Sequence, residues 1–195
     1  MGTEPVDFGI IPDDPAALRA ALERAAECDL VLSSAGVSVG EADHMKSVVA
    51  ELGGTLDFWR VRMRPGSPLA FGTVRDTPWL GLPGNPVSTL VTFELFARPA
   101  IRRLMGRRNV FTARLRVVAD EPMAGGTPVT HFMRVTLTRS PAGALFARLT
   151  GPQPSNILSS IARADALAIV PPDVRVAAGD ALDAIPLREL LDDTV

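Results

Sequence analysis

The chain has 195 residues, 47% of them hydrophobic, which is enough for one large domain or two small domains with cores of their own. Its formal net charge of −2 gives no basic field that would attract nucleic acid. The single cysteine, Cys28, excludes a disulfide framework and fits a reducing cytoplasm, and no apolar run approaches the length of a membrane span. The composition therefore predicts a cytoplasmic protein that binds neither nucleic acid nor a membrane.

The first hundred residues alternate apolar strands with helices, an order typical of a mostly parallel sheet. An aspartate cap and a proline in the first turn open the first helix near residue 15, and apolar residues at helical spacing mark a second helix over 45–52. A long helix is predicted over 86–104, bent or divided by Pro99. The strand at 29–33 is apolar in its middle, which predicts cover on both faces. The predicted strands are 8–11, 29–33, 56–63, 69–72 and 79–82.

After Gly106 the pattern changes to short strands separated by turn clusters, which is typical of a small β-barrel or sandwich. The segment 107–109 is therefore the predicted boundary between an α/β domain over residues 1–106 and a β-domain over residues 107–195. One short helix is predicted near 156–162. The predicted strands of the β-domain are 110–118, 130–137, 145–149, 167–170 and 181–186.

Two glycine-containing loops, at 33–43 and 81–88, each lie between a predicted strand and a predicted helix. Small residues let backbone N–H groups face one concavity, and a helix N-terminus adds a positive dipole, so the first loop suits an anion. The carboxylates of Glu41 and Asp43 beside such a site indicate a divalent metal, most often magnesium. The alternative is a tight turn that merely requires small residues.

The candidate residues also have structural interpretations, which remain open at this point. Asp13 and Asp43 could each cap a helix. Pro83 and Pro86 could have no role beyond shaping their loop. The alternating arginines at 60, 62 and 64 could form a solvated strand face. Of the two histidines, His44 is expected to face solvent and His131 to lie on a strand surface of the β-domain.

Three motifs, at 37–43, 64–72 and 82–88, resemble in order and spacing those of the molybdopterin molybdenumtransferases, the MoeA-type enzymes related to the gephyrin E domain. Segments at 10–14, 153–155 and 164–171 extend the resemblance over essentially the whole chain. It implies a three-layer α/β/α molybdopterin-binding (MogA-like) domain, N-terminally truncated by its first strand and helix, followed by a small barrel-like β-domain. The chain would then be the last half of a longer protein: a fragment, a gene model begun at an internal methionine, or a short paralogue.

The activity implied by the resemblance is the insertion of molybdate into adenylylated molybdopterin with magnesium, releasing AMP. The implied assembly is a homodimer, with the molybdopterin adenylyltransferase as a further partner, and the 195-residue chain alone would be weakly active or inactive. Ala35 departs from the family by replacing a usual glycine, and Ser67 stands where a lysine is common. The implied catalytic residues are Asp13, Asp43, Arg60 and Arg64, of which Asp13 and Asp43 would bind magnesium. The implied molybdopterin-binding residues are Gly36, Ser38, Gly40, Pro83, Pro86 and Ser155.

Two rival functions stay open. A non-catalytic binding or scaffold module could share the same fold. A molybdopterin adenylyltransferase-like nucleotide-binding protein, or a related nucleotide-pyrophosphate hydrolase, would share the α/β fold and the glycine loop, but would not be expected to carry the Pro-Gly-Asn-Pro loop and the β-domain.

Overall fold

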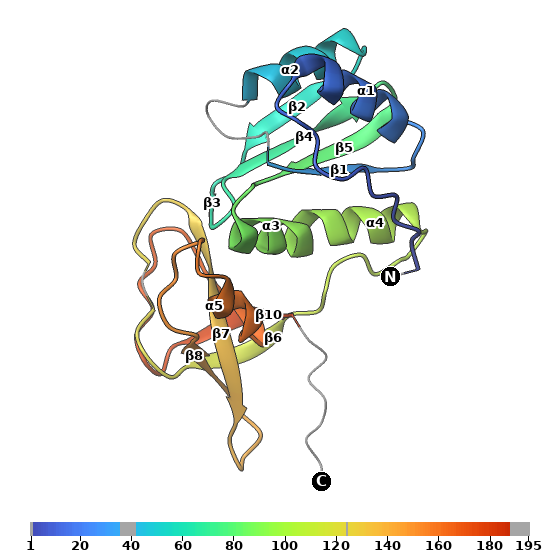
Figure 1. Cartoon of the computed structure of the whole chain (residues 1–195). Coiled ribbons are helices and arrows are strands. Elements are labelled where there is room, and N and C mark those ends of the chain that lie inside the picture. Colours follow the sequence, from blue (N-terminus) through green and yellow to red (C-terminus); the bar gives the residue numbers. More distant parts are fainter. Residues whose placement is uncertain (1, 36–41, 124, 188–195) are drawn as a thin grey trace. The chain divides into compact units, whose positions relative to one another are not determined.

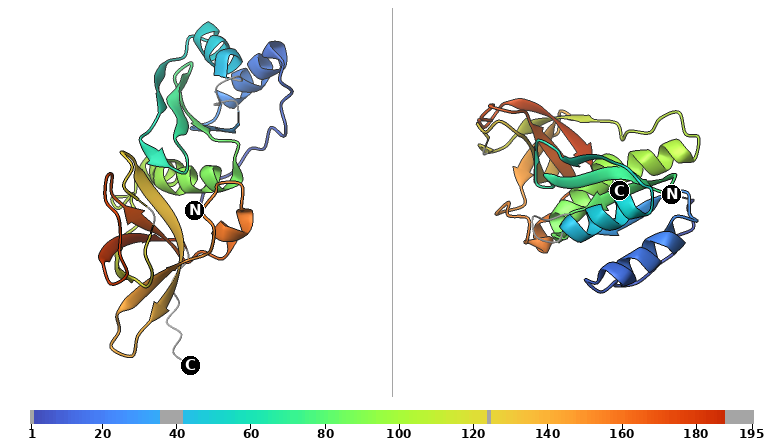
Figure 2. Two further views of the ribbon diagram at one scale, coloured as in Figure 1. Left: turned by 90° about the vertical axis from the view of Figure 1, so that its left-hand side faces the viewer. Right: turned by 90° about the horizontal axis from the view of Figure 1, so that it is seen from above.

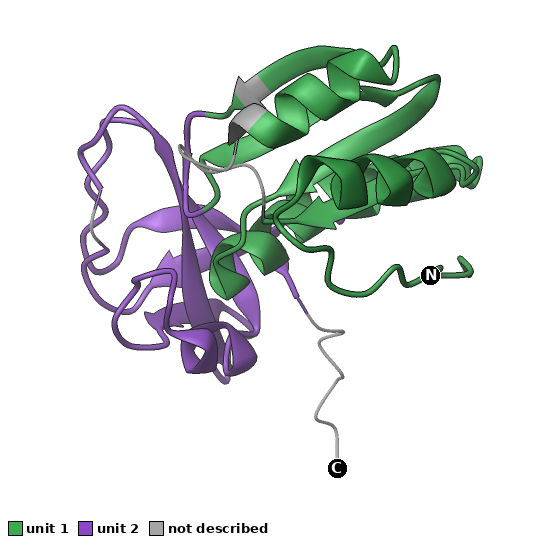
Figure 3. Ribbon diagram, turned by 45° about the horizontal axis from the view of Figure 1, so that its top comes forward, with its two compact units in different colours: residues 1–61, 66–110 green, residues 62–65, 111–195 purple. Residues whose placement is uncertain are grey.

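The structure of the chain, a computed structural model, describes residues 2–35, 42–123 and 125–187, without the side chains of residues 42, 43 and 59. It divides into two compact units, coloured separately in Figure 3. We call Met1–Val61 with Gly66–Val110 the α/β unit, and Arg62–Pro65 with Phe111–Val195 the β unit. The predicted fold class is confirmed: a MogA-like α/β domain is followed by a closed β-barrel. In the described part of the chain, no helix is long and apolar enough to span a membrane.

The α/β unit is built on a four-stranded sheet in the order β1-β5-β4-β2. The pair β1–β5 is parallel, whereas β4 is antiparallel to both of its neighbours. The prediction of a mostly parallel sheet is therefore wrong, because a two-residue turn at Arg75 and Asp76 joins β4 and β5 as a hairpin. Strands β1, β5 and β2 still run in one direction, so their carboxyl ends lie at the same edge. The strands are β1 (Val31–Ser34), β2 (Leu56–Arg60), β4 (Pro68–Val74) and β5 (Thr77–Leu82).

Helices cover both faces of this sheet and make the three layers visible in Figures 1 and 2. Helices α1 (Pro15–Ala25) and α2 (Ala42–Glu51) lie on one face, and α3 (Pro86–Thr92) and α4 (Arg98–Leu104) lie on the other. The π-helical turn η1 (Phe93–Ala97) separates α3 from α4 directly before Pro99, which has no N–H to donate. The predicted division of the long helix is confirmed. The predicted apolar face of α2 is buried through Met45, Val48, Val49 and Leu52.

Two further predictions for the α/β unit are wrong. The segment 8–11 forms no strand, because Gly9 has a φ of +71° and Ile10 is fully exposed. Strand β1 is not covered on both faces, because Val31 is buried but Leu32 is 39% exposed. Both segments were apolar enough to suggest a buried strand, but neither is packed on two sides.

In the β unit, five strands close into a barrel in the order β7-β8-β6-β10-β9, and pairing of β7 with β9 completes the circle. The prediction of a barrel-like domain is confirmed, and the bounds of β8 and β10 are those predicted, although β6 begins five residues later than expected. The short helix α5 (Leu158–Ala162) interrupts the strands. The barrel strands are β6 (Leu115–Ala119), β7 (Thr130–Arg139), β8 (Leu145–Leu149), β9 (Ala166–Val170) and β10 (Ala181–Pro186).

A further short strand, β3 (Met63–Arg64), pairs in parallel with β7, placing Met63 opposite Thr130 and Arg64 opposite His131. The single strand predicted over 56–63 is therefore two strands in two units. Its alternating side chains showed an extended segment, but could not show that the pairing partner changes after Arg60. The boundary predicted after Gly106 stays a prediction.

The start of α1 gives a first testable consequence. The Ala17 N–H donates to Asp14 Oδ2 at 2.8 Å, so Asp14 caps the helix, whereas the adjacent Asp13 makes no hydrogen bond within the described part of the chain. We expect Asp14→Ala to lower the free energy of unfolding by about 1 kcal/mol, the usual value of an N-cap. Urea unfolding checks this, with Asp13→Ala as the matched control that leaves stability unchanged. Equal losses in the two variants would contradict the assignment.

Candidate functional site

The two predicted loops leave the sheet side by side. Because β1 and β5 are parallel, Ser34 pairs with Leu82. The Ala35 N–H continues the ladder by donating to the Leu82 carbonyl at 3.1 Å, and Ser34 Oγ lies 3.5 Å from the Pro83 carbonyl that accepts from it. The first residues of one loop thus contact the first residues of the other. The predicted ligands Gly36, Ser38 and Gly40 lie outside the described residues.

The second loop is held in place by hydrogen bonds. The hydroxyl of Thr89 donates to the carbonyls of Pro83 and Asn85, and the Thr89 N–H donates to the Asn85 carbonyl at 2.8 Å. Pro83 is buried, whereas Pro86 is exposed and begins α3. The loop is therefore fixed from behind by α3, with Gly84 and Asn85 exposed at the edge of the sheet.

Asp13 lies in the groove that runs beside β1. The groove is lined by residues that include Asp13, Ser33, Ser34 and His44. Asp13 is exposed and makes no hydrogen bond with the residues that the structure describes, and Asp14 caps the helix, so the interpretation of Asp13 as the cap is wrong. His44 is exposed, as expected.

Only the backbone of Asp43 is described, in the first turn of α2. Among the side chains that the structure describes, no group of three or more His, Cys, Asp or Glu could hold a metal ion. Of the predicted magnesium pair, the structure describes the side chain of Asp13 alone, which is exposed, so the pair stays a prediction.

The two candidate arginines belong to different units. Arg60 ends β2 at the same edge of the sheet as Ser34 and Leu82, about two strand spacings or roughly 10 Å from β5. Arg64 belongs to β3 in the β unit. Both side chains are exposed and make no hydrogen bond or ion pair with described residues, whereas Arg62 donates to the Pro128 carbonyl at 2.7 Å. Arg60 and Arg64 therefore keep their full hydrogen-bonding capacity for an oxyanion.

The β unit contains a buried arginine that our reading of the sequence passed over. Arg134 on β7 is 1% exposed, and no carboxylate of the described residues pairs with it. Its Nε donates to Ser160 Oγ and its guanidinium donates to the Pro154 carbonyl, each at 3.1 Å. The backbone of Arg134 exchanges two further bonds with the Gln153 side chain. Arg134 thus fixes the segment that leads into the partly exposed Ser155.

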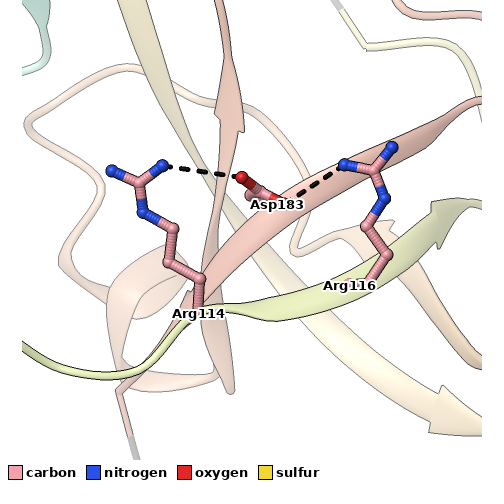
Figure 4. A network of polar contacts seen from close by, with 3 residues as sticks. All are labelled: Arg114, Arg116 and Asp183. Carbon is pink, nitrogen blue, oxygen red and sulfur yellow. Dashed lines mark hydrogen bonds and ion pairs between the residues drawn. The ribbon is translucent and has the colours of Figure 1, made fainter.

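One signal in the sequence could have singled out Arg134: it is a lone charge within the apolar run at 132–135. Arginines on the barrel surface are different. Arg114 and Arg116 lie 3.5 and 3.1 Å from the carboxylate of Asp183 (Figure 4), and their side chains are 62% and 67% exposed. Exposed ion pairs of this kind contribute little to stability, so this cluster is an ordinary solvated face.

His131 is buried, so its expected position on a strand surface is wrong. Its Nε2 lies 2.6 Å from Thr127 Oγ1, and the residue is 7% exposed. Burial, with a smaller effect from the charge of Arg64 opposite it in the ladder, lowers the pKa of His131 below its usual 6.5. The imidazole is therefore held neutral beside a candidate substrate-binding arginine.

The lowered pKa of His131 predicts a pH dependence. Below pH 6.5, His131 is protonated in the unfolded chain but stays neutral in the folded chain until the pH reaches the lower folded pKa. The free energy of unfolding is therefore unaffected by His131 above pH 6.5 and decreases as the pH falls from 6.5 towards the folded pKa. We expect the urea midpoint to fall between pH 7.5 and 5 more steeply in the natural chain than in His131→Asn. Parallel pH profiles would contradict this.

Comparison with known proteins agrees with this architecture. A family model described as "Probable molybdopterin binding domain" matches residues 1–103, and one described as "MoeA C-terminal region (domain IV)" matches residues 116–187. The fold and its paired loops thus define a two-domain protein of the molybdopterin-binding class. The chain belongs to the molybdopterin molybdenumtransferase (MoeA) family.

Individual relatives support the assignment. A molybdopterin molybdenumtransferase of Haemophilus influenzae is 32% identical over 191 residues, which cover 96% of this chain and 47% of the relative. Molybdopterin molybdenumtransferase 2 of Mycobacterium tuberculosis is 37% identical over 177 residues, 87% of this chain and 43% of the relative. A solved molybdenum cofactor biosynthesis protein of Pyrococcus furiosus matches with a TM-score of 0.72 and 28% identity, covering 94% of this chain and 58% of its own. The chain spans about half the length of the curated relatives.

Proposed function

We propose that this protein acts in molybdenum cofactor biosynthesis by inserting molybdate into adenylylated molybdopterin, with release of AMP. The observation that carries the proposal is the meeting of two loops at the carboxyl ends of the parallel strands β1 and β5, in the same unit as the free carboxylate of Asp13. Ligands of open α/β sheets bind at this edge, where the chain leaves parallel strands. The family assignment supplies the chemical class of the ligand.

The physical problem in this reaction is to bring several anions together. Asp13 and Asp43 would hold a magnesium ion, which when bound offsets the charge of the diphosphate oxygens. Backbone N–H groups of Gly36, Ser38 and Gly40 would hold the pterin phosphate. The dithiolene sulfurs that receive the metal belong to the substrate, so the chain needs no cysteine for this step.

The remaining site residues would position the substrate and stabilise charge. Arg60 and Arg64, exposed and without partners in the described structure, would bind molybdate or the departing AMP phosphate. Pro83 and Pro86 would shape the wall of the site. We further propose that Ser155 contributes from the β unit, and that the protein works in the cytoplasm as a homodimer supplied by the adenylyltransferase.

The test is AMP release from adenylylated molybdopterin, with and without molybdate and magnesium. Because the chain spans about half of its relatives, the assay is run on the chain alone and on the chain mixed with the unmatched part of the Haemophilus influenzae relative. We expect molybdate- and magnesium-dependent AMP release that is greatest in the mixture. Binding of the substrate without AMP release in either sample would favour the scaffold function instead.

A further inference from the structure

At the meeting point of the loops, an alanine has a backbone conformation that favours glycine, and the glycine opposite it has one that alanine could adopt. Ala35 has a φ of +72°, in the left-handed region that favours glycine. Gly84 lies opposite it and is not among the glycines with positive φ, so its backbone would accept an alanine. Backbone conformation therefore explains neither the alanine at position 35 nor the glycine at position 84.

The packing of Gly84 against Ala35 explains the glycine. A Cβ atom added to Gly84 would lie 3.1 Å from Ala35 Cβ and 3.4 Å from Ala35 Cα. The first distance is too short to be met without a shift of a few tenths of an ångström, whereas the second is an ordinary van der Waals contact. Gly84 therefore lacks room for a side chain only because Ala35 carries its methyl group.

Both sides of this contact are held by other bonds. The Ala35 N–H is bound to the Leu82 carbonyl at 3.1 Å. On the other side, the Pro83 carbonyl accepts from Ser34 and Thr89. Because these bonds hold both backbones, the two segments cannot move apart to accommodate a side chain at position 84 without straining the bonds.

We propose that Ala35 is a positioning residue, whose methyl group restricts position 84 to glycine and thereby keeps the Pro83–Gly84 backbone where the hydrogen bonds hold it. The inference rests on the proposed function for its consequence in substrate binding, but the contact itself can be tested apart from it. It goes beyond the candidate ligands, since Ala35 acts through the placement of the Pro83–Gly84 backbone and touches no reacting group.

The test is a double-mutant cycle of Ala35→Gly, Gly84→Ala and both together, in the 195-residue chain. We measure the urea midpoint and the magnesium-dependent Kd for adenylylated molybdopterin. Gly84→Ala is expected to lower the midpoint and weaken binding by about tenfold, since a misplacement of 1 Å can cost about a hundredfold. Adding Ala35→Gly removes the opposing methyl group, so the double variant is expected to recover both values.

The matched control is Arg75→Gly, which removes another left-handed residue, with a φ of 52°, from the turn between β4 and β5. It should not rescue Gly84→Ala. Additive effects of Ala35→Gly and Gly84→Ala would overturn the proposal, and so would recovery of the midpoint without recovery of binding. If the natural chain bound no substrate, the proposed function would fail. The urea midpoints of the single and double variants would still decide whether the methyl group of Ala35 restricts position 84.

Discussion

Replacing Asp13 and Asp43 together by asparagine is expected to abolish magnesium-dependent substrate binding without lowering stability. Asp13 is exposed and bonds to none of the described residues, so its replacement removes no contact seen in the fold. A carboxylate attracts a divalent ion about 4 Å away by about 8 kcal/mol at an effective dielectric constant near 20, and desolvation offsets most of this. We expect a net loss of about 3 kcal/mol, which corresponds to roughly a hundredfold in affinity. Calorimetric titration of the chain with adenylylated molybdopterin at several magnesium concentrations measures the effect.

The change in substrate affinity of the double variant in the absence of magnesium is a second check. With the metal absent, the two carboxylates only repel an anionic substrate, so the double variant should then bind at least as well as the natural chain. Asp14→Asn is the matched control, because asparagine caps helices as well as aspartate and Asp14 already caps α1. A loss of binding in Asp14→Asn equal to that in the double variant would show that Asp13 and Asp43 act through general charge.

Removing the guanidinium of Arg134 is expected to cause the largest loss of stability. In Arg134→Met, the buried Ser160 Oγ loses its donor, and the carbonyl of the exposed Pro154 loses a part-buried hydrogen bond. An unpaired buried group costs about 1–3 kcal/mol and an ordinary hydrogen bond about 0.5–1.5 kcal/mol, so we expect a loss of about 2–4 kcal/mol. Urea unfolding followed by circular dichroism measures this loss.

The matched control for Arg134 is Arg148→Met. Arg148 donates to Asp120 at 2.8 Å, but its side chain is 66% exposed. Exposed ion pairs contribute about 0–1 kcal/mol, so this variant should remain close to the natural chain. If Arg134→Met were as stable as Arg148→Met, Arg134 would not be the anchor of the segment before Ser155.

The parts of the fold that local sequence determines were predicted well. The spacing of Met45, Val48, Val49 and Leu52 matches one face of a helix, and these residues are buried along α2 and at its C-terminal end. Pro99 removes a backbone donor wherever it stands in a helix, so the division of the long helix followed from a single residue. The bounds of β8 and β10 could be predicted from the turn clusters beside them, because glycine and proline affect the conformation of their own backbone.

Features that depend on distant partners could not be predicted in this way. The extended segment after residue 56 changes sheets, because Met63 and Arg64 pair with residues more than sixty positions later. Burial of His131 and Arg134 depends on Thr127 and on the 150–160 segment, which no spacing along β7 indicates. The contact between Ala35 and Gly84 likewise arises only when two loops meet in space.

The most direct test of the proposed function is the equilibrium binding of adenylylated molybdopterin to the natural chain as a function of magnesium concentration. We expect saturable binding that strengthens with magnesium, is competed by AMP, and loses its magnesium dependence in the double asparagine variant of Asp13 and Asp43. Binding that is absent, or equally strong with and without magnesium, would contradict it.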